Sequence, residues 1–354
     1  KIKDEAQLMG HEPLYSRLDM NGLLRLIRGV EYAKPVKLNE SVYVTFHEVS
    51  HILGAASIAV SVHEGSKRQK VLFSGDIGNP PTLMLNPIDY VFDADYAVVE
   101  SAYGNRFHEN RAERRDLLLK VIKETVERNG ILMIPSFALE RTQELLLEFD
   151  TLFEKGSLPK VPIFVDSPLA TRISHVYGRY SHYFNEAALA LLKNNKGLLQ
   201  FPWLAYTSTT PESKRINDIP GSKIIIAGSG MSQGGRILHH ERRYLPDSKN
   251  TILFIGYQVN GSLGRKILDG QKQISIFGEP VSVNCSVESI SSYSAHADQT
   301  GLLEYVEKAN SARRLKKVFV VQGEEEGAQV LGELIREKLG IDAIIPNMHE
   351  TFDL

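Results

Sequence analysis

Two histidines occupy a short turn in which other residue types would be expected. His47 and His51 lie within VTFHEVSHILGAASIAV (44–60), between two apolar segments rich in β-branched residues. Turns between strands usually contain Gly, Asn, Asp or Pro, which tolerate unusual backbone angles. For either histidine considered alone, the better interpretation is an exposed turn residue. The remaining polar residues of the chain decide between that interpretation and a functional site.

Three further polar residues follow apolar segments of strand length. Asp76 follows KVLFSG, Glu100 follows YAVV, and Gln322 follows KVFVV. A carboxylate at the end of a buried strand can bind metal or act in catalysis, but it is also a common turn or cap residue. His296 lies between small residues in SSYSAHADQTG, where it can approach a ligand closely; the alternative is a hydrogen-bonded histidine at a helix start.

The combination of these residues favours a site. His51, Asp76, Glu100, His296 and Gln322 all fall at predicted strand ends, in two segments that flank a different kind of domain. Side chains that gather at one edge of a sheet are how layered α/β folds build sites. Histidine and aspartate without a thiolate suit Zn²⁺ or Mn²⁺ in a hydrolytic site.

The elements that must position these residues change character along the chain. After an opening helical stretch, the first hundred residues predict short strands such as 41–46, 56–64 and 96–101. The segment 111–130 predicts an amphipathic helix. Three strand–loop–helix units and a further strand follow, and their apolar strands predict a parallel sheet with helices on both faces. Short strands return after residue 263, so one α/β domain is inserted into another.

The inserted domain contains a second candidate site. Its three strands are each followed by a loop with a hydroxyl group and an arginine, and the third loop, GSGMSQGGR, is glycine-rich. Exposed backbone N–H groups at a helix start can bind anions. We interpret the three loops as a binding track for a phosphodiester chain, with solvated arginines as the alternative. The predicted substrate-binding residues are Ser136, Arg141, Ser167, Arg172, Ser229, Gly230, Ser232 and Arg236.

Composition limits the classes of protein that the chain can represent. Its 354 residues exceed the size of a usual single core, which predicts two domains. No apolar stretch approaches the about 20 residues that span a membrane. The net charge of −2 gives no overall basic signature, so a polyanion would need a local groove. A single cysteine, Cys285, excludes an internal disulfide framework and predicts a reducing, cytoplasmic compartment.

Eight motifs in order resemble one known family. They are HILGAAS, FSGDIGN, ESAYGNRFH, PSFALERTQELL, VDSPLA, GSGMSQGGR, GYQVNGSLGR and SAHAD. Together they resemble the β-CASP branch of the metallo-β-lactamase superfamily, whose members are mostly RNA-processing nucleases. The resemblance implies an αββα metallo-β-lactamase domain (1–105 and 263–354) interrupted by a Rossmann-like β-CASP cap (106–262). It also implies a zinc-dependent ribonuclease that binds RNA, preferably single-stranded, between the two domains.

The resemblance assigns roles to the strand-end residues. His51 matches a zinc ligand, and Asp76 matches the aspartate that bridges two zinc ions. His296 matches the histidine thought to act as general acid, paired with Glu100. Gln322 stands where the family has a further zinc-binding histidine.

Two features of the sequence depart from the family pattern. The main metal motif, H-x-H-x-D-H, does not occur upstream of His51, which leads us to expect that the first part of the lactamase domain is missing. An amide at Gln322 is also a weaker zinc ligand than imidazole. The alternative function is therefore a catalytically impaired pseudo-nuclease that binds RNA or a partner subunit, and a homodimer is possible. A hydrolase of small molecules is a third and weaker alternative.

Overall fold

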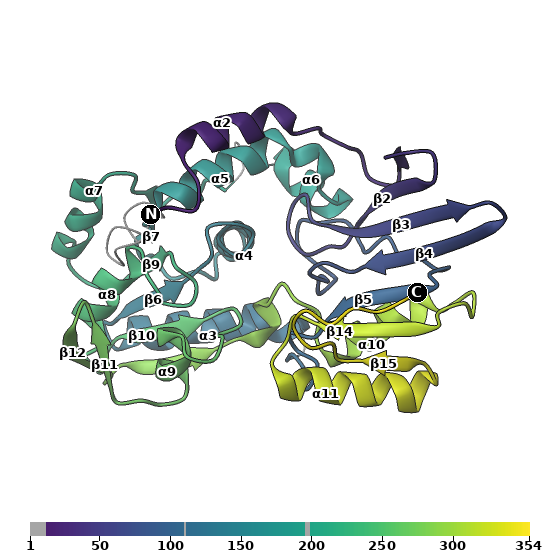
Figure 1. Cartoon of the computed structure of the whole chain (residues 1–354). Helices are drawn as coiled ribbons and strands as arrows, with labels where there is room; N and C mark the ends of the chain where they lie inside the picture. Colours follow the sequence, from purple (N-terminus) through teal and green to yellow (C-terminus); the bar gives the residue numbers. More distant parts are fainter. Residues whose placement is uncertain (1–11, 110, 195–198) are drawn as a thin grey trace.

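The computed structural model describes residues 12–109, 111–194 and 199–354. The first eleven residues, which are part of the predicted segment 1–105, lie outside the described residues. Figure 1 shows two sheets side by side, each with its own helices. This mixed α/β architecture, with one sheet inserted in sequence within the other, confirms the predicted fold class. No described helix combines the length and the apolar character that crossing a membrane would require.

The first sheet has seven strands and is built by the two ends of the chain. Its order is β1-β2-β3-β4-β5-β14-β15. Strands β1 to β4 are antiparallel, whereas β4, β5, β14 and β15 are parallel. The bounds are β1 Val36–Lys37, β2 Val42–Glu48, β3 Ala56–Glu64, β4 Lys67–Phe73, β5 Tyr96–Glu100, β14 Lys317–Val321 and β15 Asp342–Ile344.

Two helices cover this sheet. Helix α10 (Gln299–Ala309) packs on β5, and α11 (Glu325–Leu334) packs on β14. Their apolar side chains join a core with Leu72, Val99 and Val320, all fully buried. The parallel pairing of β5 with β14 brings residue 100 opposite residue 321, although 220 positions separate them in sequence. This pairing therefore joins the N-terminal and C-terminal parts of the chain at the edge of the sheet where Glu100 and Gln322 lie.

The second sheet has six strands, and all of them are parallel. Its order is β13-β10-β6-β9-β7-β8. The bounds are β6 Ile131–Pro135, β7 Ile163–Val165, β8 Leu204–Tyr206, β9 Lys223–Ala227, β10 Thr251–Phe254 and β13 Ser286–Ser289. Strand β13 lies in the segment predicted to belong to the lactamase domain, yet it pairs with β10. The predicted domain boundaries remain predictions.

Helices cover both faces of the six-stranded sheet, as its near-continuous apolar strands predict. In β6, Leu132 and Ile134 face the core under α3, α4 and α5, whereas Ile131 and Met133 face the core under α8. The helices around this sheet are α3 Arg114–Glu127, α4 Arg141–Glu154, α5 Pro168–Arg179, α6 Glu186–Asn194, α7 Thr210–Arg215, α8 Ile237–Tyr244 and α9 Leu263–Leu268. A hairpin of β11 (Gln273–Ile276) and β12 (Glu279–Ser282) extends the α8 side, and α2 (Arg17–Leu26) precedes the first sheet.

Candidate active site

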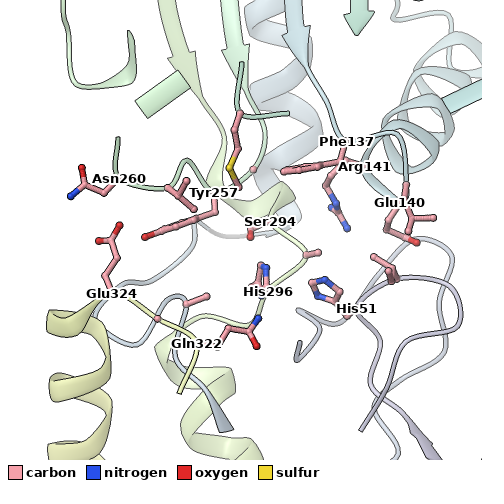
Figure 2. Close-up of a pocket in the computed structure, with 18 residues that line it drawn as sticks. His51, Phe137, Glu140, Arg141, Tyr257, Asn260, Ser294, His296, Gln322 and Glu324 are labelled. Atoms are coloured by element: carbon pink, nitrogen blue, oxygen red, sulfur yellow. The ribbon is translucent and has the colours of Figure 1, made fainter. Parts of the chain in front are cut away.

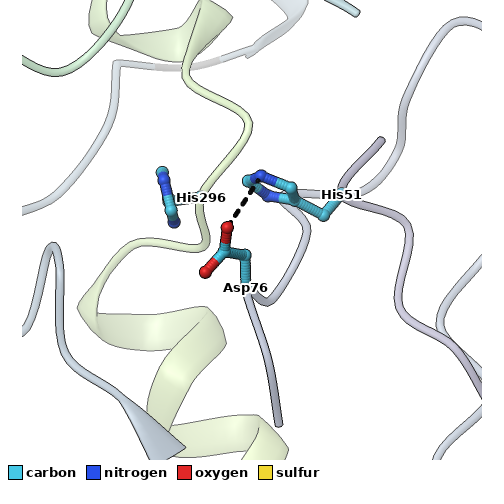
Figure 3. Close-up of side chains that lie close together, drawn as sticks. All are labelled: His51, Asp76 and His296. Atoms are coloured by element: carbon cyan, nitrogen blue, oxygen red, sulfur yellow. Dashed lines mark ion pairs between the residues drawn. The ribbon is translucent and has the colours of Figure 1, made fainter. Parts of the chain in front are cut away.

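The strand-end residues predicted from the sequence come together between the two sheets. His51 follows β2, Asp76 follows β4, Glu100 ends β5, and Gln322 follows β14. His296 arrives on the segment between β13 and α10. Figure 3 shows His51, Asp76 and His296 directed at one another from three separate segments. The structure therefore brings together all five residues on which the metal-site prediction rests.

Close backbone packing fixes the segments that carry Asp76 and His296. Gly78 and His296 form an isolated β-bridge, and the N–H of Ala297 donates to the carbonyl of Ile77 at 2.8 Å. A Cβ atom at Gly78 would lie 2.0 Å from the carbonyl oxygen of Ser50. Only glycine allows the His51 loop and the Asp76 loop to approach this closely. Steric hindrance therefore explains why the second glycine of FSGDIGN, Gly78, has no side chain.

His51, Asp76 and His296 form a group of possible metal ligands. One donor atom of each lies within 4.8 Å of the others. The His51 Nε2 is 3.5 Å from Asp76 Oδ2, and the centres of the two imidazole rings are 4.6 Å apart. Two imidazoles and a carboxylate are the ligand types that Zn²⁺ binds, so this set suits one divalent ion. Among the residues described, it is the one such group of three or more histidine, cysteine or acidic side chains.

The surroundings favour different protonation states for the two histidines. Burial and the positive charge of His296 lower the pKa of His51 to about 4, so its ring is neutral near pH 7 and can bind metal. Burial also lowers the pKa of His296, but the hydrogen bond and charge of Glu100 outweigh this and raise it. His296 therefore holds a proton more readily than His51 does.

Glu100 orients His296 and the Asp76 loop together. Its carboxylate is 1% exposed and lies 2.8 Å from His296 Nδ1 through Oε2. The other oxygen, Oε1, accepts a hydrogen bond from the N–H of Ile77. With Nδ1 held by Glu100, the Nε2 atom of His296 is left for a ligand or a substrate. This geometry suits the acid–carboxylate pair that the resemblance implies.

Gln322 contacts the same group but through its amide nitrogen. The Nε2 group of Gln322 donates to Asp76 Oδ1, and the residue has φ +53°, a conformation uncommon for a residue with a side chain. This bond engages the Asp76 oxygen that does not face His51. The group of Gln322 that contacts Asp76 is therefore an N–H donor, which cannot bind a metal ion.

A cavity of about 640 Å³ opens beside these residues, between the two parts of the molecule. His51, His296 and Gln322 line it from the seven-stranded side, and residues after β6 and β10 line it from the cap (Figure 2). Because the carboxyl ends of parallel strands from both sheets meet at this cavity, each sheet contributes its loops to it. Phe137 and Tyr257 provide aromatic surface in the cavity wall.

Arg141 is the one predicted substrate-binding residue that lines this cavity. Its guanidinium points from the start of α4 toward His51 and His296 (Figure 2). It is 6% exposed and donates to Glu144 and to the carbonyl of Tyr293. Its Nε–H group has no hydrogen-bond partner within the described residues. A buried guanidinium with an unused donor beside two histidines suits a phosphate group.

The other predicted binding residues make internal contacts. The Ser136 hydroxyl is 3.0 Å from that of Thr142, Ser167 caps α5 by accepting from Ala170 N, and Ser229 accepts from Gln233 N. Arg172 is exposed on α5 outside the cavity lining.

The glycine-rich loop is also held from inside. Ser232 donates to buried Glu241, and Arg236 donates to Asp166 at 2.7 Å. Gly230 packs against an aromatic ring, since a Cβ there would lie 2.6 Å from a ring carbon of Phe137. Substrate contact by these residues remains a prediction.

Sequence reasoning did not identify Glu140, which also lines the cavity. Its carboxylate is 1% exposed and accepts from Tyr177 Oη at 2.5 Å and from Leu53 N at 3.3 Å, so it joins the cap to the His51 loop. The residue has φ +64° and ψ −60°, a strained backbone for a residue with a side chain. Burial raises its pKa to about 7. A glutamate next to an arginine at a helix start is too common a pattern to indicate this role.

Comparison with known proteins agrees with this architecture. The model of the β-CASP domain matches residues 142–267, and the model described as the Zn-dependent metallo-hydrolase RNA specificity domain matches residues 280–346. The first segment includes β7, β8, β9 and β10 of the six-stranded sheet, whereas the second includes β13 of that sheet together with β14 and β15 of the seven-stranded sheet.

Several curated proteins are similar over almost the whole chain. Ribonuclease TTHA0252 of Thermus thermophilus is 33% identical over 335 residues, which are 94% of this chain and 74% of the relative. An RNase J-like protein of Methanocaldococcus jannaschii is 31% identical over 94% of this chain and 76% of its own length. The transcription termination factor FttA of Pyrococcus horikoshii is 31% identical over 98% of this chain, which spans only 54% of that relative. The chain belongs to the β-CASP family of metallo-β-lactamase-fold ribonucleases.

Proposed function

We propose that the chain hydrolyses phosphodiester bonds of RNA in the cavity between its two parts, with a divalent metal ion held by His51 and Asp76 and with His296 beside it as the general acid. One observation carries the proposal: three donor atoms of zinc-binding types lie within 4.8 Å of one another beside a cavity that a buried arginine also lines. A bound ion of this kind polarises a phosphoryl oxygen and lowers the pKa of water.

The other side chains of the site would bind the phosphate, supply a proton and hold the reacting groups in position. Arg141 would bind the scissile phosphate, because the residue lines the cavity and its Nε–H group has no hydrogen-bond partner among the described residues. His296 would deliver a proton from Nε2 to the leaving oxygen, since Glu100 holds Nδ1 and raises the pKa. General acid catalysis of this kind contributes about 10²- to 10⁴-fold. Gln322 and Glu100 would fix Asp76 and His296 in position.

Zinc is the proposed ion because the ligands are imidazole and carboxylate, with Mn²⁺ as the second choice. The sequence led us to expect two ions. The described residues supply one such group of candidate ligands, so we propose one ion, held by His51 and Asp76 of this group. Binding of a second ion remains an expectation from the resemblance.

The proposed substrate is single-stranded RNA. Phe137 and Tyr257 can stack on bases, and stacking tolerates different sequences. Relatives named as ribonucleases support RNA as the substrate class. A role in RNA processing, a cytoplasmic location and association with a second copy or a related subunit are further proposals that rest on the sequence.

His296→Ala tests the proposal directly. We expect cleavage of single-stranded RNA to fall about 10²- to 10⁴-fold while RNA affinity in a metal-free buffer is retained. His63→Ala is a suitable control, because His63 lies at the far end of β3. Metal content per chain would be measured on the same preparations. Wild-type protein that binds RNA and metal but does not cleave would instead support the pseudo-nuclease alternative.

A further inference from the structure

A second cavity, lined by basic residues, lies in the cap away from the candidate active site. Its volume is about 510 Å³, and it is lined by residues of α7 and α8. Figure 1 shows both helices on the side of the six-stranded sheet that is remote from the seven-stranded sheet. The chain as a whole carries a net charge of −2, so the concentration of positive charge at this groove is local.

The lining of this α7–α8 groove is cationic. Lys214, Arg236, Arg242 and Arg243 line it together with two histidines, and no carboxylate is among the described lining residues. Buried Asp166 forms an ion pair with Arg236 at 2.7 Å, and exposed Glu279 forms one with Arg242 at 2.6 Å. Lys214 and Arg243 form no ion pair with any described residue. Two cations therefore remain available to an anionic ligand.

The groove has polar groups suited to phosphate along its length. Thr210 and Ser213 on α7, Arg236 directly before α8 and His239 on α8 are all among its lining residues. Tyr244 at the end of α8 donates to Asn217, which follows α7, at 2.8 Å. The guanidinium of Arg243 lies over the Tyr244 ring, 5.7 Å from its centre. Several cations around one opening suit a chain of phosphates better than a single anion.

The glycine-rich loop connects this groove to the active-site cavity. Met231 of this loop lines the cavity, whereas Arg236, at the loop's end, lines the groove. The strands beneath run in the order β6-β9-β7-β8, and β6 and β7 are two strand spacings apart, about 10 Å. A single strand leaving the cavity over this loop would reach the groove within a few nucleotides.

We propose that the α7–α8 groove binds backbone phosphates of the RNA strand that extends from the active-site cavity. The proposal rests on the proposed function, because it gives the same RNA substrate a second contact region. The groove takes no part in bond cleavage. Its contribution is affinity for long strands, so short substrates are cleaved without it.

The test neutralises the two unpaired cations in the full chain. Affinity for single-stranded RNA of about 8 and about 25 nucleotides is measured for the double variant K214Q/R243Q in metal-free buffer at several salt concentrations. We expect the longer RNA to bind about tenfold or more weakly. The slope of log affinity against log salt concentration falls by about 1.4, which is about 0.7 for each lost phosphate contact. Binding and metal-dependent cleavage of the short RNA stay unchanged.

A matched control removes the same charge from the opposite face of the cap. Lys120 and Lys123 are exposed on α3, which covers the other face of the six-stranded sheet. K120Q/K123Q should leave both affinities unchanged. Equal affinity of K214Q/R243Q and K120Q/K123Q for the long RNA would overturn the groove proposal while cleavage of short RNA still supported the active site. A wild-type chain that neither binds nor cleaves RNA would overturn both proposals.

Discussion

Two aspartates, one in each part of the molecule, follow β-strands but have opposite surroundings. Asp76 follows β4, has a side chain 40% exposed, and faces His51 at 3.5 Å. Asp166 follows β7, is fully buried, and accepts hydrogen bonds from Thr207, Ser213 and Arg236. A carboxylate at a strand end is available as a ligand when it stays partly exposed beside another ligand group. It becomes a structural centre when the helices of its own sheet enclose it.

The same contrast separates the two groups of predicted site residues. The residues at the edge of the seven-stranded sheet face elements from both ends of the chain and the cap, and space remains between them. The hydroxyl groups and arginines at the edge of the six-stranded sheet mostly bond to neighbouring loops of the same sheet. Polar character at a strand end therefore does not distinguish substrate contact from loop support.

The largest expected effect is on cleavage at Asp76. Asp76→Asn removes a charged metal ligand, and the loss of several kcal/mol of transition-state stabilisation corresponds to about a 10³-fold lower rate. The thermal midpoint should change little, because the side chain is partly exposed. Cleavage rate and bound metal are the measurements. Asp89→Asn, at another partly exposed carboxylate paired with a histidine, is the control; a rate like that of this control would remove Asp76 from the metal site.

Asp166→Ala should show the opposite pattern. Removing the carboxylate leaves buried His240 and partly buried Arg236 without their partner, which costs about 3–5 kcal/mol of stability. Denaturant unfolding measures this loss, with Asp247→Ala at an exposed carboxylate as control. Cleavage by the molecules that remain folded should persist. If Asp166→Ala abolished cleavage at unchanged stability, the contrast between the two aspartates would be wrong.

The pH dependence of stability at acid pH is a second test of the structural role of Asp166. Burial raises its pKa, but the hydrogen bonds from His240, Ser213, Thr207 and Arg236 outweigh burial and lower it overall. A lowered pKa in the folded state stabilises the protein above the unfolded-chain value of about 3.9, and this stabilisation is lost as the pH falls through the folded-state value. The difference in stability between wild type and Asp166→Ala should therefore shrink below about pH 4.

The sequence predicted more of the fold than of the contacts. Alternating apolar strands and helices indicated the inserted parallel sheet, because periodicity reflects burial directly. The meeting of His51 and Asp76 was predictable, since each follows a strand of the seven-stranded sheet. His296 is brought to them by the segment before α10, through its bridge to Gly78. The strained backbone and interdomain bond of Glu140 were not, because they depend on how the cap packs against the His51 loop. The internal bonds of Ser232 and Arg236 depend on tertiary contacts in the same way.

Gln322→His tests whether the side chain at position 322 reaches the metal site beside Asp76. An imidazole in place of the amide adds a stronger ligand beside Asp76, so we expect metal affinity to rise about tenfold. Metal titration measures this gain, and Gln329→His, which places a histidine on the exposed face of α11, is the matched control. Unchanged affinity would show that the 322 side chain does not reach the ion.

The smallest expected effect concerns Glu140, the carboxylate that joins the two parts. Burial raises its pKa to about 7, so its contribution to stability is fully present below the unfolded value of about 4.3 and is lost as the pH rises through 7. Glu140→Gln keeps an oxygen for Tyr177 and Leu53 but cannot ionise. It should stabilise the protein by about 1–3 kcal/mol at pH 8 and by little at pH 5. Exposed Glu154→Gln is the control, and a pH profile of Glu140→Gln equal to that of this control would show that Glu140 is not a buried acid that joins the cap to the His51 loop.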